Sequence, residues 1–158
     1  TNSEELYNLA KVYRVHGATK KYHHEYVGYN SRLDTMQAAI LLVKMKYIEE
    51  SIRKRTTIAN WYNERLSNVE FVRIPKGKFN QQPVYYVYNI LVEKRDGLVY
   101  YLKENGIQTS IYYPRPLHLQ ECFQGLGYKK GDFPVAEKVC ELILALPIYP
   151  EITVLEVE

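Results

Sequence analysis

The sequence lacks any continuous apolar run of the length that a membrane-spanning helix needs. Such a helix takes about 20 consecutive apolar residues, so we expect a protein that does not cross a membrane. A signal-peptide pattern is also missing, and the two cysteines, Cys122 and Cys140, are too far apart to form a C-x-x-C pair. Together these absences predict reduced thiols and a cytoplasmic location.

Features of nucleic-acid or metal binding are scarce as well. The net charge is only +3, and no cluster of lysine and arginine is interleaved with aromatic residues. His23 and His24 are adjacent but have no cluster of cysteines or carboxylates at a metal-ligand spacing nearby. We therefore expect no nucleic acid and no metal ion as partners. The small positive charge suits an anionic small molecule.

The composition that remains is that of a globular protein. The chain has 158 residues, of which 46% are hydrophobic and 25% charged, enough for one domain with a real core. Its 16 tyrosines can serve a core, an interface or a ligand site, because the ring is apolar and its tip is polar. The chain begins with Thr1 instead of methionine, and this start predicts a piece of a longer protein.

Helical spacing dominates the first half of the chain. It predicts a helix over residues 3–15, ended by Gly17, and an irregular loop over 20–30. Residues 33–67 contain no Gly or Pro and predict one long helix. Residues 38–43 of this helix are apolar on every side and are expected to be buried all round, whereas the later half is expected to expose a polar face with i,i+4 ion pairs.

The second half alternates between strand and helix patterns. Strands are predicted over residues 69–74, 84–92 and 107–113, and helices over 95–105, 119–123 and 134–146. The economical interpretation is an α+β fold, in which a long helix leads into a small domain with an antiparallel or mixed sheet flanked by helices. The chain then divides into a linking helix and loop (1–32), a connecting helix (33–68) and a small C-terminal domain (69–158).

A polar loop before the long helix is the first candidate site. Residues 28–34 read GYNSRLD, and Ser31 and Asp34 have the spacing of a capping box that opens a helix. Asn30 and Arg32 beside a helix N-terminus would form a site for a phosphate or a carboxylate. The alternative is that Ser31 and Asp34 only cap the helix, that Asn30 turns the chain and that Arg32 is solvated.

The second candidate site follows the last predicted strand. Residues 112–118 read YYPRPLH, so that Tyr112, Tyr113, Arg115 and His118 are held in a segment stiffened by prolines. Aromatic and polar side chains in such a segment would form a wall for a polar cyclic ligand. A purely structural role is an equally good interpretation of the residues themselves.

Several short motifs along the chain occur together in one known protein family. They are, in order, YHH at 22–24, GYNSRLD at 28–34, QAAI at 37–40, RD at 95–96, GI at 106–107, YPRPLH at 113–118 and LPIYPE at 146–151. In this combination the chain resembles the C-terminal part of the DegT/DnrJ/EryC1/StrS sugar aminotransferases. The resemblance covers nearly the whole chain.

The resemblance implies an enzyme of the aspartate-aminotransferase fold (fold type I) that uses pyridoxal 5'-phosphate (PLP). Such enzymes move an amino group, usually from glutamate, to a keto group of a nucleotide-linked sugar for cell-surface polysaccharide or antibiotic synthesis. The family implies a homodimer in which Asn30 contacts the cofactor phosphate, and Arg32 the substrate, in the partner's site. Tyr112, Tyr113 and His118 would form the substrate wall, with the choice between the two tyrosines left open.

Two features depart from the complete family pattern. The family's Schiff-base lysine lies upstream of the matched segment, so no catalytic residue is expected in this chain, and the chain alone is expected to be inactive. Residues 85–88 read YYVY where many members have a histidine. The alternative function is therefore a non-catalytic interaction or regulatory domain that keeps the same fold.

Overall fold

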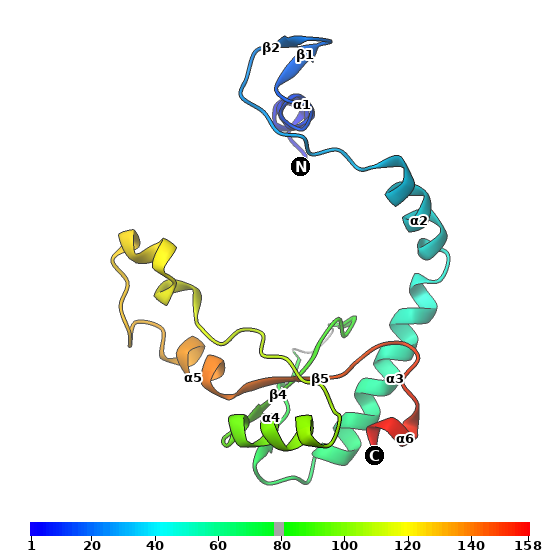
Figure 1. Cartoon of the computed structure of the whole chain (residues 1–158), viewed down its shortest axis with the longest axis vertical. Coiled ribbons are helices and arrows are strands. Elements are labelled where there is room, and N and C mark those ends of the chain that lie inside the picture. The colour runs from blue at the N-terminus through cyan, green and yellow to red at the C-terminus, as the bar shows by residue number, and fades with distance from the viewer. Residues whose placement is uncertain (78–80) are drawn as a thin grey trace. The chain divides into compact units, whose positions relative to one another are not determined.

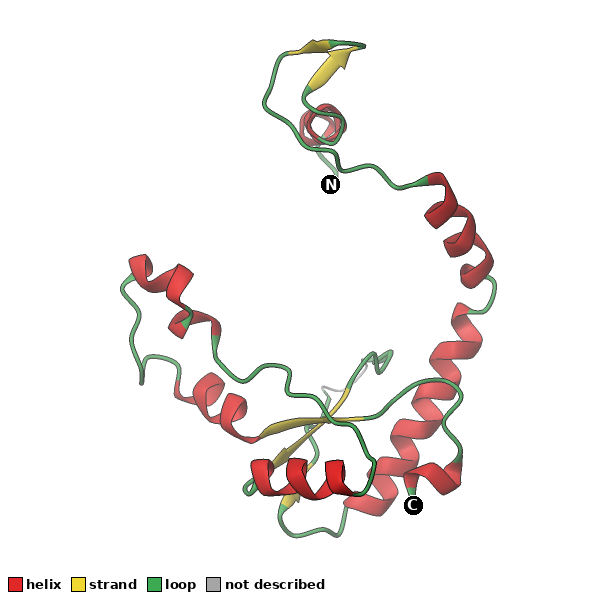
Figure 2. Ribbon diagram, viewed as in Figure 1, coloured by secondary structure: helices red, strands yellow, loops and turns green. Residues whose placement is uncertain are grey.

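The computed structural model describes residues 1–77 and 81–158, which form two compact units, Thr1–Ile48 and Glu49–Glu158 (Figure 1). The described residues contain helices, two short 3₁₀ helices and small antiparallel sheets joined by loops (Figure 2), which confirms the α+β class. Within the described residues, no helix is both long enough and apolar enough to span a membrane. The division into 1–32, 33–68 and 69–158 stays a prediction.

The first unit begins with a capped helix and a hairpin. Helix α1 (Glu4–Tyr13) starts where the Ser3 hydroxyl accepts the Leu6 N–H at 3.3 Å. The helix predicted over 3–15 ends earlier, at Tyr13 with Arg14 as its C-cap, so Gly17 is not its terminator, although Gly17 has the left-handed conformation with a φ of 70°. The irregular loop predicted over 20–30 is partly wrong, because β1 (Ala18–Lys20) pairs with β2 (His23–His24).

Backbone hydrogen bonds hold the polar loop against the end of α1. Tyr29 N–H donates to Tyr13 O at 2.7 Å, and His16 N–H donates to Tyr29 O at 2.9 Å. Ser31 N–H donates to Arg14 O at 2.9 Å. The loop that carries Asn30 is therefore fixed to α1 by the main chain, which leaves its side chains free for other contacts.

The single helix predicted over 33–67 is wrong, since the structure has two helices. Helix α2 (Thr35–Met45) ends in bonds of the i→i+3 type, from Lys46 N–H to Val43 O at 3.2 Å and from Tyr47 N–H to Lys44 O at 3.0 Å. A separate helix, α3 (Ile48–Leu66), begins directly after these residues. Neither Gly nor Pro marks the break, so the sequence pattern did not show it.

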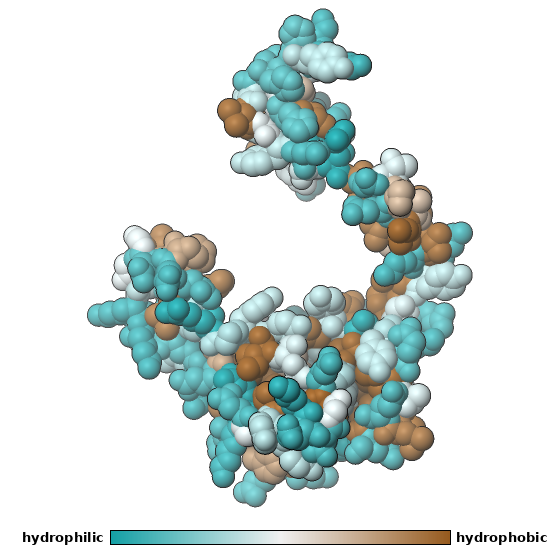
Figure 3. Space-filling model, viewed as in Figure 1, coloured by the Kyte–Doolittle hydropathy of each residue, from teal (hydrophilic) through white to brown (hydrophobic). Residues whose placement is uncertain are grey.

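Helix α2 exposes the apolar side chains that were expected to be buried all round. Ile40 is 58% exposed, Leu41 49% and Leu42 70%, and brown apolar residues lie among hydrophilic ones on the visible surface of this helix (Figure 3). The expectation is wrong for this chain because the described residues do not cover the helix. Apolar surface of this extent is typical of an interface.

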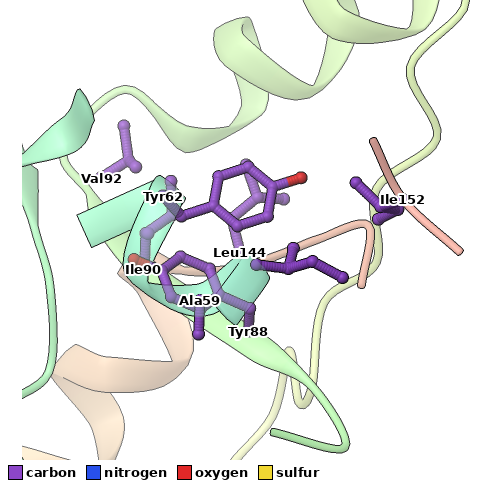
Figure 4. Packing of buried hydrophobic residues seen from close by; sticks show 8 residues of the cluster. Ala59, Tyr62, Tyr88, Ile90, Val92, Leu144 and Ile152 are labelled. Atoms are coloured by element: carbon purple, nitrogen blue, oxygen red, sulfur yellow. The ribbon is translucent and has the colours of Figure 1, made fainter. Parts of the chain in front are cut away.

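The second unit is built around a three-stranded antiparallel sheet. Its strands, in spatial order, are β3 (Val72–Arg73), β4 (Tyr88–Val92) and β5 (Ile143–Leu146). One face of α3 packs on this sheet, with Ile58, Ala59 and Tyr62 buried (Figure 4). The opposite face of α3 is polar as predicted, and Lys54 Nζ and Glu50 Oε1 form an i,i+4 ion pair at 2.9 Å.

The remaining elements connect and flank the sheet. They are α4 (Arg95–Glu104), the 3₁₀ helices η1 (Leu117–Leu119) and η2 (Glu121–Leu126), α5 (Pro134–Leu142) and α6 (Val154–Val157). The helix predicted over 119–123 is thus 3₁₀. The strands predicted over 69–74 and 84–92 are shorter, as β3 and β4.

The helix predicted over 134–146 is wrong in its last turn. Ile143 to Leu146 leave α5 and form β5, because their backbone groups pair with β4 and their side chains fill the core. A short apolar run fits a buried strand and a buried helix equally well. The strand predicted over 107–113 is reduced to one bridge, with Ala145 N–H donating to Ser110 O at 2.7 Å.

We predict that Gly17→Ala or Gly28→Ala releases the loop from α1. A Cβ at Gly17 would meet the Tyr26 carbonyl oxygen, and a Cβ at Gly28 would meet the Gly17 backbone nitrogen. Hydrogen exchange should show local opening of the Tyr29 and Ser31 amides easier by about 2 kcal/mol or more. Gly97→Ala is the control, because a Cβ there meets nothing within 4 Å, and it should be neutral or stabilising. Unchanged exchange in the first two variants would contradict this picture.

We predict that the stability of the second unit falls in alkaline solution. Burial, with smaller effects of Tyr85 and Tyr62, raises the pKa of Tyr88 from 10.0 to about 12. The neutral phenol is favoured in the folded state, so the stabilisation is complete below pH 10 and is lost as the pH rises toward 12.

Denaturant unfolding at several pH values checks this expectation. Tyr88→Phe should flatten the decline, at a cost of about 1 kcal/mol at neutral pH for the lost hydrogen bond to Asn63. Tyr101→Phe is the control, because its ring is 64% exposed. An equally steep decline in Tyr88→Phe would sink the assignment.

Candidate functional site

Asn30 and Arg32 lie together on the loop of the first unit. Arg32 Nε donates to Asn30 Oδ1 at 3.1 Å, and both side chains are exposed. Within the described part of the chain, the Asn30 amide N–H groups and the remaining guanidinium N–H groups have no acceptor. The pair thus presents a set of free donors with one positive charge, which suits a phosphate or a carboxylate.

The helix N-terminus beside this pair differs from the prediction. Asp34, not Ser31, is the N-cap of α2, and its Oδ1 accepts the Met36 N–H at 2.8 Å. The capping box with Ser31 is wrong because α2 begins at Thr35, one residue after Asp34, and the Ser31 N–H is used by Arg14 O. An anion at Asn30 and Arg32 would therefore be bound by side chains, while a carboxylate already caps the helix.

Tyr112, Tyr113 and His118 come together in the second unit. All three line an open cavity of about 630 Å³ between the 112–118 segment and α5. The two tyrosine rings meet edge to face, with centroids 5.7 Å apart. Tyr112 is 42% exposed and Tyr113 71%, so both rings are accessible to a ligand. The choice between the two tyrosines stays open.

The sequence analysis missed Glu137 on α5. Its Oε1 accepts a hydrogen bond from His118 Nε2 at 3.0 Å, and the two side chains are only 13% and 8% exposed. The Phe133 ring packs against the imidazole at a tilt of 57°, with centroids 4.8 Å apart. Glutamate in the first turn of a helix is ordinarily explained by the helix dipole, so no pattern in the sequence linked this residue to His118.

Backbone groups also hold the Glu137 carboxylate. Gly131 N–H donates to both of its oxygens, at 2.8 and 3.0 Å, and Phe133 N–H donates at 3.3 Å. Partial burial acts to raise the pKa of Glu137, but the N–H groups of Gly131, His118 and Phe133 outweigh it and hold the pKa below its usual value. Glu137 is therefore an ionised acceptor at neutral pH.

The predicted site residues thus form two groups. Asn30 and Arg32 belong to the first unit, and Tyr112, Tyr113 and His118 belong to the second. Each group is assembled within its own unit, as a pair of donors in one and as a cavity wall in the other.

This chain matches only part of the length of the similar proteins of known sequence. A "pleiotropic regulatory protein" of Geobacillus stearothermophilus is 46% identical over 154 residues, which are 96% of this chain and 41% of that protein. A dTDP-3-amino-3,6-dideoxy-alpha-D-galactopyranose transaminase of Aneurinibacillus thermoaerophilus is 36% identical over 100% of this chain and 43% of its own. The chain spans about two fifths of the length of these relatives.

Solved structures have the same fold. The structure of DesV from S. venezuelae matches with a TM-score of 0.91 at 32% identity, over 99% of this chain and 42% of that one. A DegT DnrJ EryC1 StrS aminotransferase from Brucella abortus matches with a TM-score of 0.86 at 36% identity, over 99% and 42%. The model of the family described as "DegT/DnrJ/EryC1/StrS aminotransferase family" matches residues 1–158, and the chain belongs to this family.

Proposed function

We propose that the longer protein containing this chain is a PLP-dependent aminotransferase, with glutamate as amino donor and a nucleotide-linked keto-sugar as acceptor. The observation that carries the proposal is the family match over residues 1–158. Relatives named as transaminases of dTDP-linked sugars support the substrate class. In this proposal the chain is the C-terminal part of a cytoplasmic enzyme, and the Schiff-base lysine lies in the part that precedes it.

The donors on the loop fit the phosphate group of PLP. Asn30 offers amide N–H groups and Arg32 offers a guanidinium, and both side chains are exposed on a loop fixed by the main chain. PLP, when bound, supplies an electron sink for the carbon that carries the amine. Asn30 would hold the cofactor phosphate, and Arg32 would bind the anionic or hydroxyl groups of the sugar nucleotide.

The exposed helix that follows the loop supports a homodimer. Leu41, Leu42 and Val43 are 49%, 70% and 55% exposed, an arrangement that is unfavourable in water unless another surface covers it. In the proposed dimer, the apolar side chains of α2 are buried in the assembled protein. The loop before α2 reaches the partner's active site. Tyr112, Tyr113 and His118 form the sugar-facing wall of the site.

A regulatory function is the second candidate. The relative that is 46% identical carries the name "pleiotropic regulatory protein". A domain of this fold without the upstream lysine could bind a sugar nucleotide through the same loop and cavity and would have no transaminase activity.

One experiment separates the two candidates. The full-length protein is incubated with PLP, glutamate and a panel of keto-sugar nucleotides, and α-ketoglutarate and the amino sugar are measured. The enzyme proposal predicts both products in equal amounts and their loss when the upstream lysine is replaced by alanine. Binding of the sugar nucleotide with no product and no such lysine would favour the regulatory function.

For the loop, we predict separate effects of Asn30 and Arg32. In the full-length protein, Asn30→Ala should weaken PLP affinity about tenfold, the loss of one hydrogen bond. Asn30→Asp should weaken it further, because the acceptor for Arg32 remains while the donors become a negative charge. Arg32→Ala should raise the KM for the sugar nucleotide about tenfold or more through the lost charge-assisted bond.

Lys20→Ala is the matched control, an exposed cation of the same unit on β1. It should leave both constants within about twofold, as expected of an exposed charge for which the described residues contain no ion-pair partner. Normal cofactor affinity and normal KM in the Asn30 and Arg32 variants would favour the alternative in which Asn30 only turns the chain and Arg32 is solvated.

A further inference from the structure

The contact between His118 and Glu137 determines which nitrogen of the imidazole carries the proton. An ionised carboxylate only accepts hydrogen bonds, so His118 Nε2, 3.0 Å from Glu137 Oε1, must carry the hydrogen. In the neutral ring the lone pair then resides on Nδ1. The small exposed fractions of the two side chains, 8% and 13%, protect this bond from water.

The other ring nitrogen is open. In the described part of the chain, His118 Nδ1 makes no hydrogen bond. Among the described side chains, Asn89 Oδ1 is the buried polar atom that lacks a hydrogen-bond partner, so His118 Nδ1 is not fully buried. Nδ1 therefore keeps accessible surface. His118 lines the 630 Å³ cavity with Tyr112 and Tyr113, so a ligand in that cavity would lie beside the imidazole ring.

Packing alone does not account for this arrangement. The Glu137 carboxylate already accepts the N–H groups of Gly131 and Phe133, so it does not need an imidazole to be satisfied. An imidazole that packs against the Phe133 ring likewise needs no ionic partner. The added bond contributes orientation, because it fixes both the rotation of the ring and the position of its proton.

We propose that Glu137 is a positioning residue that holds His118 with Nε2 protonated, so that Nδ1 accepts a hydrogen bond from a hydroxyl group of the sugar. The inference rests on the proposed function, in which His118 belongs to the substrate wall. It adds an acceptor of defined direction to a cavity that also contains the donors of Arg115 and the polar groups of Tyr112, Tyr113 and Gln120.

The first test reads the proton directly. In the full-length protein, ¹⁵N NMR of labelled histidines, with the His118 signals identified by their loss in His118→Phe, should show the Nε2–H form. Glu137→Ala should give a mixture of tautomers. Glu137→Gln should retain the Nε2–H form, because its amide oxygen still accepts from the ring. The Nδ1–H form in the unmodified protein, or no change in Glu137→Ala, would overturn the proposal.

The second test measures kinetics in a double-mutant cycle. Glu137→Ala and His118→Phe should each raise the KM for the sugar nucleotide about tenfold, the loss of one hydrogen bond, with PLP affinity unchanged. The double variant should show no further increase, since both changes remove the same interaction. Glu137→Gln should restore most of the affinity. Additive effects would mean that Glu137 acts only on the fold and would refute the positioning role.

Controls separate the possible failures. Glu141→Ala on α5 removes an exposed carboxylate that pairs with Lys138 and should leave KM and tautomer unchanged. If Glu137→Ala does not fold, the comparison of Glu137→Gln with His118→Phe carries the test, because Glu137→Gln keeps an oxygen acceptor for Gly131 and Phe133 and His118→Phe leaves the carboxylate intact. The NMR measurement needs no turnover. The expected tautomers without any transamination would therefore contradict the proposed function and leave the Glu137–His118 pairing supported.

Discussion

The packing of α3 on the sheet forms the hydrophobic core of the second unit. Ile58, Ile90 and Leu144 are at most 1% exposed at this contact. The Tyr62 ring stacks on the Tyr88 ring, with centroids 4.8 Å apart, and its hydroxyl donates to Pro147 O at 2.9 Å. Helix and sheet thus fix the chain just after β5 by a hydrogen bond as well as by apolar burial.

The same contact controls where the cavity wall lies. Strand β5 is held by β4 on one side and by the Ser110 bridge on the other, and the segment that carries Tyr112 and Tyr113 leaves from that bridge. The helix that carries Glu137 runs directly into β5. Both walls of the cavity are therefore continuous with the best-packed strand, which keeps His118 and Glu137 within hydrogen-bond distance.

Sequence reasoning succeeded where local chemistry decides the structure. The N-cap of α1 at Ser3, the extent of α4 and the ion pair of Glu50 with Lys54 follow from neighbours in the chain. It failed where distant residues decide. Ile143 to Leu146 form a strand because β4 pairs with them, and Glu137 meets a histidine 19 positions away. The pairing of Asn30 with Arg32 was within reach of the sequence, whereas the partner of His118 was not.

The close approach of two glycines has a mechanical consequence for the loop. Gly17 and Gly28 let two backbone segments lie so near each other that no side chain fits between them. Three main-chain hydrogen bonds then join residues 13–16 to residues 29–31. The end of α1 and the loop therefore form one backbone unit, so that a displacement of α1 is transmitted to Asn30. A sequence change that displaces α1 would therefore displace Asn30 as well.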